Sequence, residues 1–343
     1  MEKPKLLLTG YRAYGDWIYT SPVLPFLFEK YYVFCDMNLK GEHLFFDDPR
    51  FAGKAIFIFE DKPVEQFARL AEERKIKMRE QVKPDFEIDL IGTLEGACIA
   101  RREQQEYNRP VGDRRVIYGS NGFYDAIFKR CGVELPLALN LEGLWIPREL
   151  EEWGLKWRAQ LGDKFAVTIA TNGSSIHKVF RNWRSLVDRI LEKYDDAIVY
   201  LSGDDEKSLS AYKHERVRVL SHKSVPFKQA MYMMKYMDLV IGPETGLLVA
   251  AGMWGTPKMM LMSASSVWQA NQYTRNDFSF QLPVPCSPCH LSVFELADCE
   301  NVAKDGLEAM PLCVKRFPID MIMDRVNYIY HGVRKTHKEL VNV

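Results

Sequence analysis

Short apolar runs alternate with amphipathic stretches along most of the chain. In the first half the runs cover residues 5–9, 31–36, 55–60 and 86–92, and a charged stretch over roughly 63–80 predicts a helix. Another helix is expected to start at Ser21-Pro22, because Ser caps helices and Pro suits the first helical position. Strands that alternate with helices are typical of a parallel sheet with helices packed on it.

The second half repeats this pattern more clearly. Apolar runs at 165–170, 197–201, 216–220, 238–241 and 257–262 predict strands, and helices are expected over 183–194, from Pro226, over 247–254 and over 318–335. We interpret the stripe of Met231, Met234 and Met237 as core filling. An amphipathic connector near 141–160 puts a domain boundary near residue 148. The chain is thus expected to form two similar α/β halves.

Length and charge limit the function classes. A chain of 343 residues is too long for one ordinary core and suits two domains of about 150 residues. The 46 basic and 46 acidic residues balance, whereas attraction to nucleic acid needs a surplus of cations. Because no run approaches the ~20 apolar residues of a membrane span and the N-terminus lacks a signal-peptide pattern, we expect a soluble cytoplasmic protein.

The first candidate segment for chemistry follows the first strand. In open α/β sheets, ligands bind outside the carboxyl ends of the strands. Gly15 permits a tight turn there, and Asp16 is expected in a loop at this edge. Its carboxylate could accept a proton from a hydroxyl nucleophile. The alternative is that Asp16 only caps a turn.

Two further segments lie at strand ends in the second half. After the 238–241 run, a Gly-containing turn leads into a helix whose free N–H groups suit a diphosphate. Glu244 in that turn would rather bind sugar hydroxyls, or cap the helix at Thr245. After the 165–170 run, small polar residues such as Thr171 and Ser174 could wrap a phosphate, with Lys178 and Arg181 as countercharge. A solvated loop is the alternative.

The cysteines form a third kind of candidate. Seven cysteines in a chain this large do not indicate a secreted disulfide framework. Cys286 and Cys289 form a C-x-x-C pair, and with Cys299 and Cys313 they could hold a structural zinc, with His290 as alternate ligand. Knuckle sites more often pair two C-x-x-C units, so we expect no metal and reduced, partly buried thiols, with zinc as the alternative.

Taken in order, these motifs are similar to those of a known family. Residues 15–31, 86–102 and 238–262, and Cys313 before a terminal helix, resemble segments of the ADP-heptose:lipopolysaccharide heptosyltransferase family, glycosyltransferase family 9. The resemblance implies a GT-B fold. Its two Rossmann-like domains would be an acceptor-side domain over 1–148 and a nucleotide-sugar-binding domain over 149–315, and a C-terminal helix in 316–343 would pack back on the first domain.

The resemblance also implies an activity. Family members are inverting, metal-independent transferases that need no cofactor, so it implies a nucleotide-diphosphate sugar donor such as ADP-heptose, a glycan or lipopolysaccharide-type acceptor, and peripheral contact with the inner membrane surface. Asp16 matches the proposed general base, and Lys178 resembles the basic residue at the donor phosphate.

The donor-site turn matches the family with two departures. Thr245, Gly246 and Leu247 match the helix start that meets the diphosphate. Glu244 stands where the family has Asp, and Val249 where it has His, so the donor sugar and base stay open. A nucleotide-sugar epimerase or hydrolase of the same fold, and a non-catalytic sugar-nucleotide-binding protein, are the alternatives.

Overall fold

The structure is a computed structural model of the chain. It describes residues 2–10, 13–37, 43–45, 47–56, 73, 75–90, 93–94, 109–221, 225–291, 293, 295–305, 308–314 and 317–334. The chain divides into two compact units. The first comprises residues 1–94 and 123–147, and the second comprises residues 95–122 and 148–343. The second unit therefore includes a segment from the first half of the sequence.

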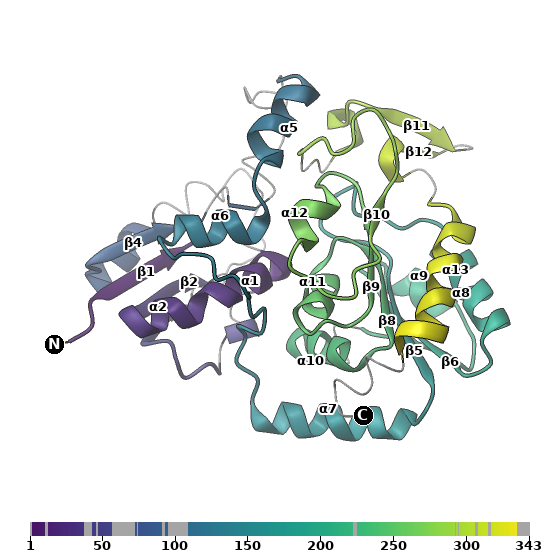
Figure 1. The fold of residues 1–343 in the computed structure, drawn as a ribbon, viewed down its shortest axis with the longest axis horizontal. Coiled ribbons are helices and arrows are strands. Elements are labelled where there is room, and N and C mark those ends of the chain that lie inside the picture. The colour runs from purple at the N-terminus through teal and green to yellow at the C-terminus, as the bar shows by residue number, and fades with distance from the viewer. Residues whose placement is uncertain are drawn as a thin grey trace. The chain divides into compact units, whose positions relative to one another are not determined.

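The first unit contains a parallel sheet. Its strands are β1 (Lys5–Thr9), β2 (Tyr32–Met37), β3 (Gly53–Ile56) and β4 (Phe86–Asp89), in the order β3-β2-β1-β4. Figure 1 labels β4, β1 and β2 of this sheet. These strands coincide with the predicted runs, although residues 57–60 of the third run lie outside the described residues. Residues 75–82 are helical, and most of the helix predicted over 63–80 also lies outside them.

One helix of this unit begins earlier than its sequence pattern indicates. The chain is helical from α1 (Tyr14–Thr20) through a 3₁₀ turn (Ser21–Val23) into α2 (Leu24–Lys30), and α6 (Phe123–Arg130) follows later. The predicted helix start at Ser21 is therefore wrong, as is the predicted loop around Gly15 and Asp16. The physical reason is that the Asp16 carboxylate accepts the N–H of Ala13 at 2.9 Å and so stabilises an earlier helix start.

The second unit is built on a larger parallel sheet. Its strands run in the order β10-β9-β8-β5-β6-β7. They are β5 (Phe165–Ala170), β6 (Ala197–Ser202), β7 (Val217–Val219), β8 (Leu239–Pro243), β9 (Lys258–Met262) and β10 (Phe280–Gln281). The first five match the predicted runs. β10 was not predicted, because two residues leave no periodic signal, and neither was the antiparallel pair β11 (Val302–Asp305) and β12 (Glu308–Pro311).

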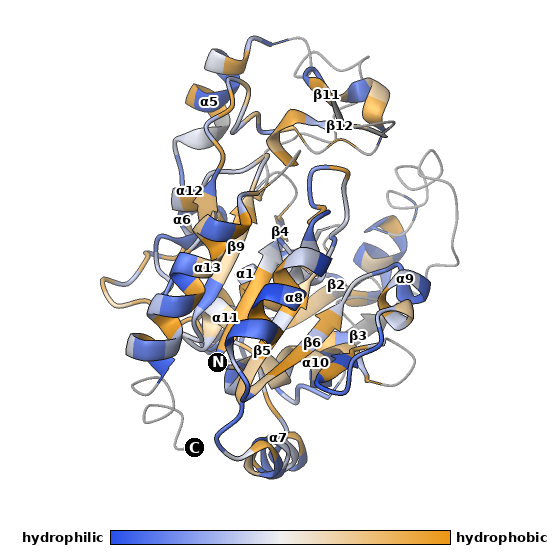
Figure 2. Cartoon of the chain, turned by 90° about the vertical axis from the view of Figure 1, so that its right-hand side faces the viewer, coloured by the Kyte–Doolittle hydropathy of each residue, from blue (hydrophilic) through white to orange (hydrophobic). Residues whose placement is uncertain are grey.

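The second unit also contains helices. They are α5 (Val111–Gly119), α7 (Arg148–Leu161), α8 (Trp183–Lys193), α9 (Glu206–Ala211), α10 (Phe227–Met233), α11 (Gly246–Met253), α12 (Val267–Asn271) and α13 (Ile319–Tyr328), the last continuing into a π turn (Ile329–Val333). In the described part of the second unit, 3₁₀ turns cover Met234–Tyr236, Leu296–Asp298 and Leu312–Val314. Figure 2 shows polar residues on the outer helices α8 and α9 and apolar residues along the strands β5 and β6 that they flank.

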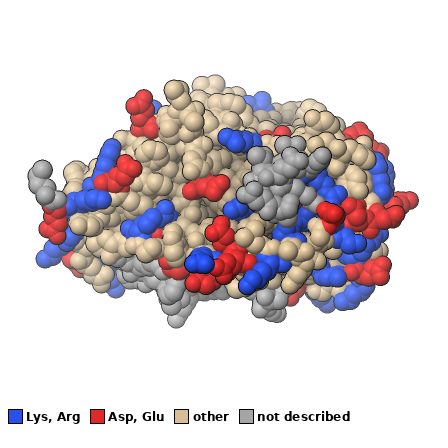
Figure 3. Space-filling view, turned by 60° about the horizontal axis from the view of Figure 1, so that its bottom comes forward, with Lys and Arg blue, Asp and Glu red and all other residues tan. Residues whose placement is uncertain are grey.

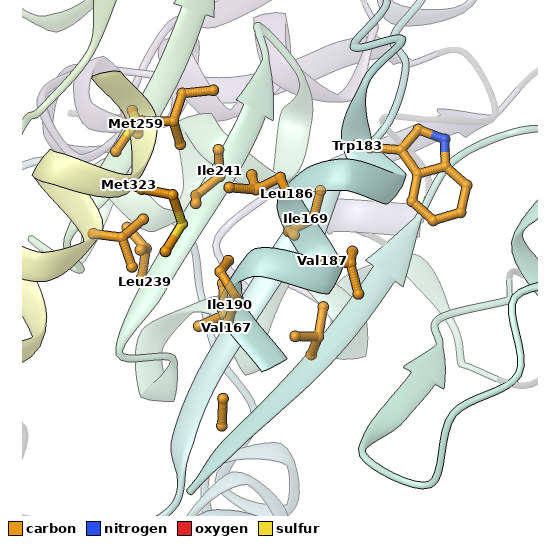
Figure 4. Close-up of a cluster of buried hydrophobic side chains, with 14 of the residues drawn as sticks. Val167, Ile169, Trp183, Leu186, Val187, Ile190, Leu239, Ile241, Met259 and Met323 are labelled. Carbon is orange, nitrogen blue, oxygen red and sulfur yellow. The ribbon is translucent and has the colours of Figure 1, made fainter. Parts of the chain in front are cut away.

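The core of this unit explains why the apolar runs become strands. Side chains of β5, β8 and β9 meet one face of α8 and Met323 of α13, and all are buried (Figure 4). Complete burial of an aliphatic side chain of this size stabilises the fold by about 1.5–3 kcal/mol. The interpretation of the methionine stripe is confirmed, because Met231, Met234 and Met237 have no exposed surface.

The C-terminal helix α13 packs on α8 within the second unit through Ile322, Met323 and Val326. Residues 335–343 lie outside the described residues, so the return of the segment 316–343 to the first domain stays a prediction. No described helix has the length and apolar character needed to cross a membrane. On the face in Figure 3, basic and acidic side chains are interspersed, which suits the balanced charge of the chain.

Candidate functional site

The order of the strands in the second sheet creates a switch point. From β5 the chain proceeds outward on one side through β6 and β7, and it then returns to the other side of β5 with β8, β9 and β10. The connections after β5 and β8 therefore leave in opposite directions, and such a point is where open α/β sheets bind ligands. The backbone is tight here, because a Cβ at Gly242 would lie 2.5 Å from the Ala170 carbonyl oxygen and its φ is +154°.

The loop that follows β5, residues 171–178, is here called the donor loop, after the prediction that it binds the donor phosphate. An antiparallel bridge between Asn172 and Val179 closes it, and the Gly173 N–H donates to the carbonyl of Lys178. A Cβ at Gly173 would lie 3.0 Å from the Lys178 Cβ and 3.1 Å from the Glu244 carbonyl oxygen. The donor loop is thus pressed against the turn after β8, and glycine makes this approach possible.

Lys178 and Glu244 form a buried ion pair across this approach. The Lys178 Nζ and the Glu244 Oε2 are 3.7 Å apart, and the side chains are only 9% and 8% exposed. A buried ammonium and carboxylate compensate one another, whereas either one alone would carry a large desolvation cost. The structure therefore brings together two predicted site residues that lie 66 positions apart in sequence, and Lys178 already has a countercharge.

Hydroxyls without a hydrogen-bond partner among the described residues occur both at the start of α11 and in the donor loop. Thr245 is the N-cap of α11, but its hydroxyl makes no capping hydrogen bond. Among the described residues, the buried Oγ atoms of Thr245 and Ser175 have no hydrogen-bond partner. Leaving a buried polar group unsatisfied costs about 1–3 kcal/mol, so these hydroxyls favour a ligand that bonds to them. Gly246 begins α11, and the Leu247 side chain is buried, so Leu247 can offer a ligand only its backbone.

Two predicted residues of the donor loop do not join this cluster. The Thr171 hydroxyl donates to the Ser202 carbonyl at 3.3 Å, so it ties the loop to β6, and Ser174 is exposed. Sequence reasoning missed a second link, to the segment after β6, in which the Asn172 side chain and Asp204 exchange two hydrogen bonds of 2.9 Å. The signal available was Gly203, where a Cβ would lie 2.1 Å from the Thr171 Oγ1.

In the first unit, Asp16 lies in the first turn of α1 rather than in a loop. Its Oδ2 accepts the Ala13 N–H, and its carbonyl accepts the Thr20 hydroxyl at 2.8 Å. The side chain is neither buried nor fully exposed. The carboxylate at the end of β4, Asp89, instead forms an ion pair with Lys75 at 2.8 Å.

The four clustered cysteines are all described. Burial raises the pKa of Cys289 to about 12, and the neighbouring thiols of Cys286 and Cys299 add to the rise. Burial raises the pKa of Cys286, Cys299 and Cys313 too, so the thiols are protonated at neutral pH. In the described part of the chain, no three His, Cys, Asp or Glu side chains come together as a group that could hold a metal ion. The zinc site considered from the sequence therefore stays a prediction.

Comparisons with known proteins bear on the fold. No protein-family model and no curated protein matches the sequence. Among solved structures, the ADP-heptose lipopolysaccharide heptosyltransferase II of E. coli superposes with a TM-score of 0.60 over 95% of this chain and 98% of that one, at 11% identity. The chain has the fold of these glycosyltransferases.

Two other structures support the same assignment. A family 9 glycosyl transferase from Veillonella parvula DSM 2008 has a TM-score of 0.56 at 13% identity, over 82% of this chain and 87% of that one. The dodecameric iron-containing heptosyltransferase TibC, solved with ADP-D-β-D-heptose, has a TM-score of 0.57 at 15% identity, over 97% and 78%. The family 9 fold expected from the motifs is therefore confirmed.

Proposed function

We propose that this protein is a glycosyltransferase that binds a nucleotide-diphosphate sugar at the donor loop and the turn Glu244–Leu247, together called the donor site. One observation carries the proposal: the donor loop and the turn Glu244–Leu247, at the switch point of the second sheet, contain a buried ion pair, two buried hydroxyls without partners among the described residues and a helix N-terminus. Heptosyltransferases of the same fold, one of them solved with ADP-D-β-D-heptose, lend support.

The chemistry of the donor site suits the two halves of such a donor. A diphosphate accepts hydrogen bonds, so it suits the N–H groups at the start of α11, the Thr245 hydroxyl and the Lys178 ammonium. The Glu244 carboxylate repels phosphate and accepts hydrogen bonds from sugar hydroxyls. We infer that donor binding exchanges the Lys178–Glu244 pair for two new contacts, Lys178 to phosphate and Glu244 to sugar.

The proposed reaction is a single inverting displacement. The acceptor hydroxyl oxygen bonds to the anomeric carbon while its proton passes to the Asp16 carboxylate. The bond from the anomeric carbon to the phosphate oxygen breaks, and the nucleoside diphosphate leaves with the electron pair. Lys178 and the α11 N–H groups stabilise the charge that develops on the leaving group. We propose that these groups suffice without a metal and that the acceptor is a glycan, of the lipopolysaccharide type.

A ligand panel tests the donor site. ADP, GDP, UDP and CDP, each with and without a sugar, are added while the unfolding temperature is followed. A ligand at 100 times its Kd stabilises the protein by about 2.7 kcal/mol. The double variant Lys178→Met, Glu244→Gln removes both charges without leaving either one buried alone, and it should lose this stabilisation. The control Lys156→Met, on the exposed part of α7, should keep it. If no member of the panel stabilises the wild-type protein, the proposal is wrong.

Donor turnover separates the alternatives. A transferase consumes the donor mainly when an acceptor is present, a hydrolase or epimerase consumes or interconverts it without one, and a pure binding protein does neither. The expected result is donor loss that depends on a glycan acceptor, with one nucleoside diphosphate released per glycoside formed.

A further inference from the structure

Two arginines of helix α5 donate hydrogen bonds to a loop of the second unit. We define the cysteine loop as the described residues between Pro285 and Glu300. Arg114, whose side chain has no exposed surface, donates to the Cys289 carbonyl at 2.9 Å and to both Glu300 carboxylate oxygens at 2.8 Å. Arg115 donates at 2.8–3.0 Å to the backbone carbonyls of Pro285, Ser287 and Pro288. These contacts fix the backbone of the cysteine loop relative to α5.

The cysteine loop is bonded in turn to the loop after β9. The Ser287 Oγ donates to the Ser263 carbonyl at 2.5 Å. The Gln281 amide group reaches the Ser263 carbonyl at 2.9 Å, the Ser265 carbonyl at 3.0 Å and the Ser287 Oγ at 2.8 Å. The Gln281 side chain thus joins β10, the loop after β9 and the cysteine loop. The loop after β9 cannot shift without breaking several of these hydrogen bonds.

The last step of the chain reaches the donor loop. The Ser263 Oγ donates to the carbonyl of His177 at 2.9 Å, and the Ile176 N–H donates to the Val293 carbonyl at 3.3 Å. His177 directly precedes Lys178, and both are buried. Two independent hydrogen bonds therefore set the backbone of the donor loop against segments that α5 and Gln281 hold.

We infer that Arg115 is a positioning residue of the donor site, acting through the cysteine loop and Ser263 on the backbone that carries Lys178. The expected effect on donor affinity rests on the proposed function. The expected effect on the backbone of the donor loop does not, because it concerns contacts within the chain alone. Loops place binding groups well only where a scaffold fixes them, and a shift of about 1 Å is enough to weaken a site. In this protein the scaffold includes a helix from the first half of the sequence.

The second unit offers a matched control. Arg216 also donates to three backbone carbonyls, those of Leu191, Tyr194 and Asp195, at 2.7–3.1 Å, and like Arg115 it is half-buried. It precedes β7, so it acts at the amino edge of the same sheet, opposite the donor site. Arg115→Ala and Arg216→Ala thus remove similar bonds at opposite edges, and a merely structural role predicts similar effects for the two.

Hydrogen exchange in the full-length protein tests, without any ligand, whether Arg115 stabilises the backbone of the donor loop. In Arg115→Ala, exchange in peptides covering 171–180 should become roughly three- to thirtyfold faster than in the wild type, which corresponds to about 0.65–2 kcal/mol of coupling. In Arg216→Ala it should not change. If Arg115→Ala does not fold, Ser287→Ala, which removes only one hydroxyl from the same chain of bonds, takes its place. Equal exchange in 171–180 for both arginine variants would overturn the inference.

Calorimetric titration with the tightest binder among ADP, GDP, UDP and CDP tests whether Arg115 affects the affinity of the donor site. The Kd should rise roughly three- to thirtyfold in Arg115→Ala and stay within twofold in Arg216→Ala. If the wild-type protein binds none of the four, the proposed function fails while hydrogen exchange still decides the inference. If the wild type binds one and Arg115→Ala binds it equally well, the inference fails and the proposed function stands.

Discussion

Lys258 offers the sharpest test of the physical reasoning, because a buried ammonium should weaken the fold at neutral pH. Its Nζ lies under α11, where a Cβ at Gly252 would be 2.8 Å away, and it donates to the Asn271 Oδ1 at 2.7 Å. Burial lowers the pKa of Lys258 from 10.5 to about 8, although the carboxylates of Asp277 and Glu244 partly oppose the change. We predict that Lys258→Met stabilises the protein.

The expected change in the free energy of unfolding follows from the pKa of Lys258. Since one pKa unit corresponds to 1.36 kcal/mol, keeping Lys258 charged costs the fold about 3 kcal/mol below pH 8. The substitution removes this cost, but it leaves the Asn271 Oδ1 without its donor, which costs about 1–3 kcal/mol. Asn271 keeps its bonds to Asp277 and Ser279. The expected net gain at pH 7 is about 1 kcal/mol, within a range of about 0–2.

The direction in which the stability difference between the wild type and Lys258→Met changes with pH decides whether Lys258 is buried as a charged amine. A lysine with a folded pKa below its unfolded value carries its full cost below the folded pKa, and the cost fades as pH rises toward the unfolded pKa. Wild-type stability should therefore rise by up to about 2 kcal/mol relative to Lys258→Met between pH 7.5 and 9.5. Tyrosines with raised pKa, such as Tyr194 at about 12, oppose this above pH 10, but equally in both proteins.

Urea unfolding followed by tryptophan fluorescence, at steps from pH 6.5 to 9.5, measures this difference. The exposed Lys156→Met on α7 is the control, and its stability relative to the wild type should not vary with pH. A Lys258→Met protein that loses more than about 2 kcal/mol at pH 7 would contradict the argument, since it would mean that the amine stabilises its site. A difference independent of pH would refute the burial of a charged amine.

Three further predictions concern the candidate site. Asp16→Asn should leave the Kd for the nucleoside diphosphate nearly unchanged and lower donor turnover by about 10²-fold or more, since it removes the proposed base; unchanged turnover would exclude Asp16 from the mechanism. Gly173→Ala should raise that Kd about tenfold or more, because its Cβ would meet the Lys178 Cβ at 3.0 Å, and titration calorimetry with Gly112→Ala as a control in open space checks it. Cys289 and Cys313, with raised pKa values, should react with a thiol reagent at pH 7 only after unfolding; prompt reaction, or zinc released on reaction, would show another arrangement.

The sequence pattern predicts the frame of the second unit well, because its strands are continuous apolar runs buried on both faces. β5 coincides with the predicted run 165–170, and the helix after it follows a clear 3.6-residue period. The pattern fails where the signal is not periodic. β10 has two residues, and the capping bond of Asp16 moves a helix start seven residues upstream of Ser21.

The residues of the proposed donor site were inferred from the sequence, whereas the contacts among them are seen only in the structure. Strand ends and small polar residues point to Lys178, Glu244 and Thr245, because the carboxyl edge of a parallel sheet gathers such loops. The ion pair between Lys178 and Glu244 depends on the spatial adjacency of β5 and β8, which periodicity does not encode. For the same reason nothing in the sequence assigned α5 to the second unit, where Arg114 meets Glu300 at a separation of 186 residues.

The second unit is formed by two separate stretches of the sequence, which matters for the design of a fragment that contains it. A fragment that starts at the connector helix and runs to the C-terminus would leave out α5 and so deprive Glu300 of its guanidinium partner and the Cys289 carbonyl of its donor. Joining this half to a different first domain would fail in the same way unless the 109–122 segment is included. The natural exchange unit of this protein is therefore two stretches of chain rather than one.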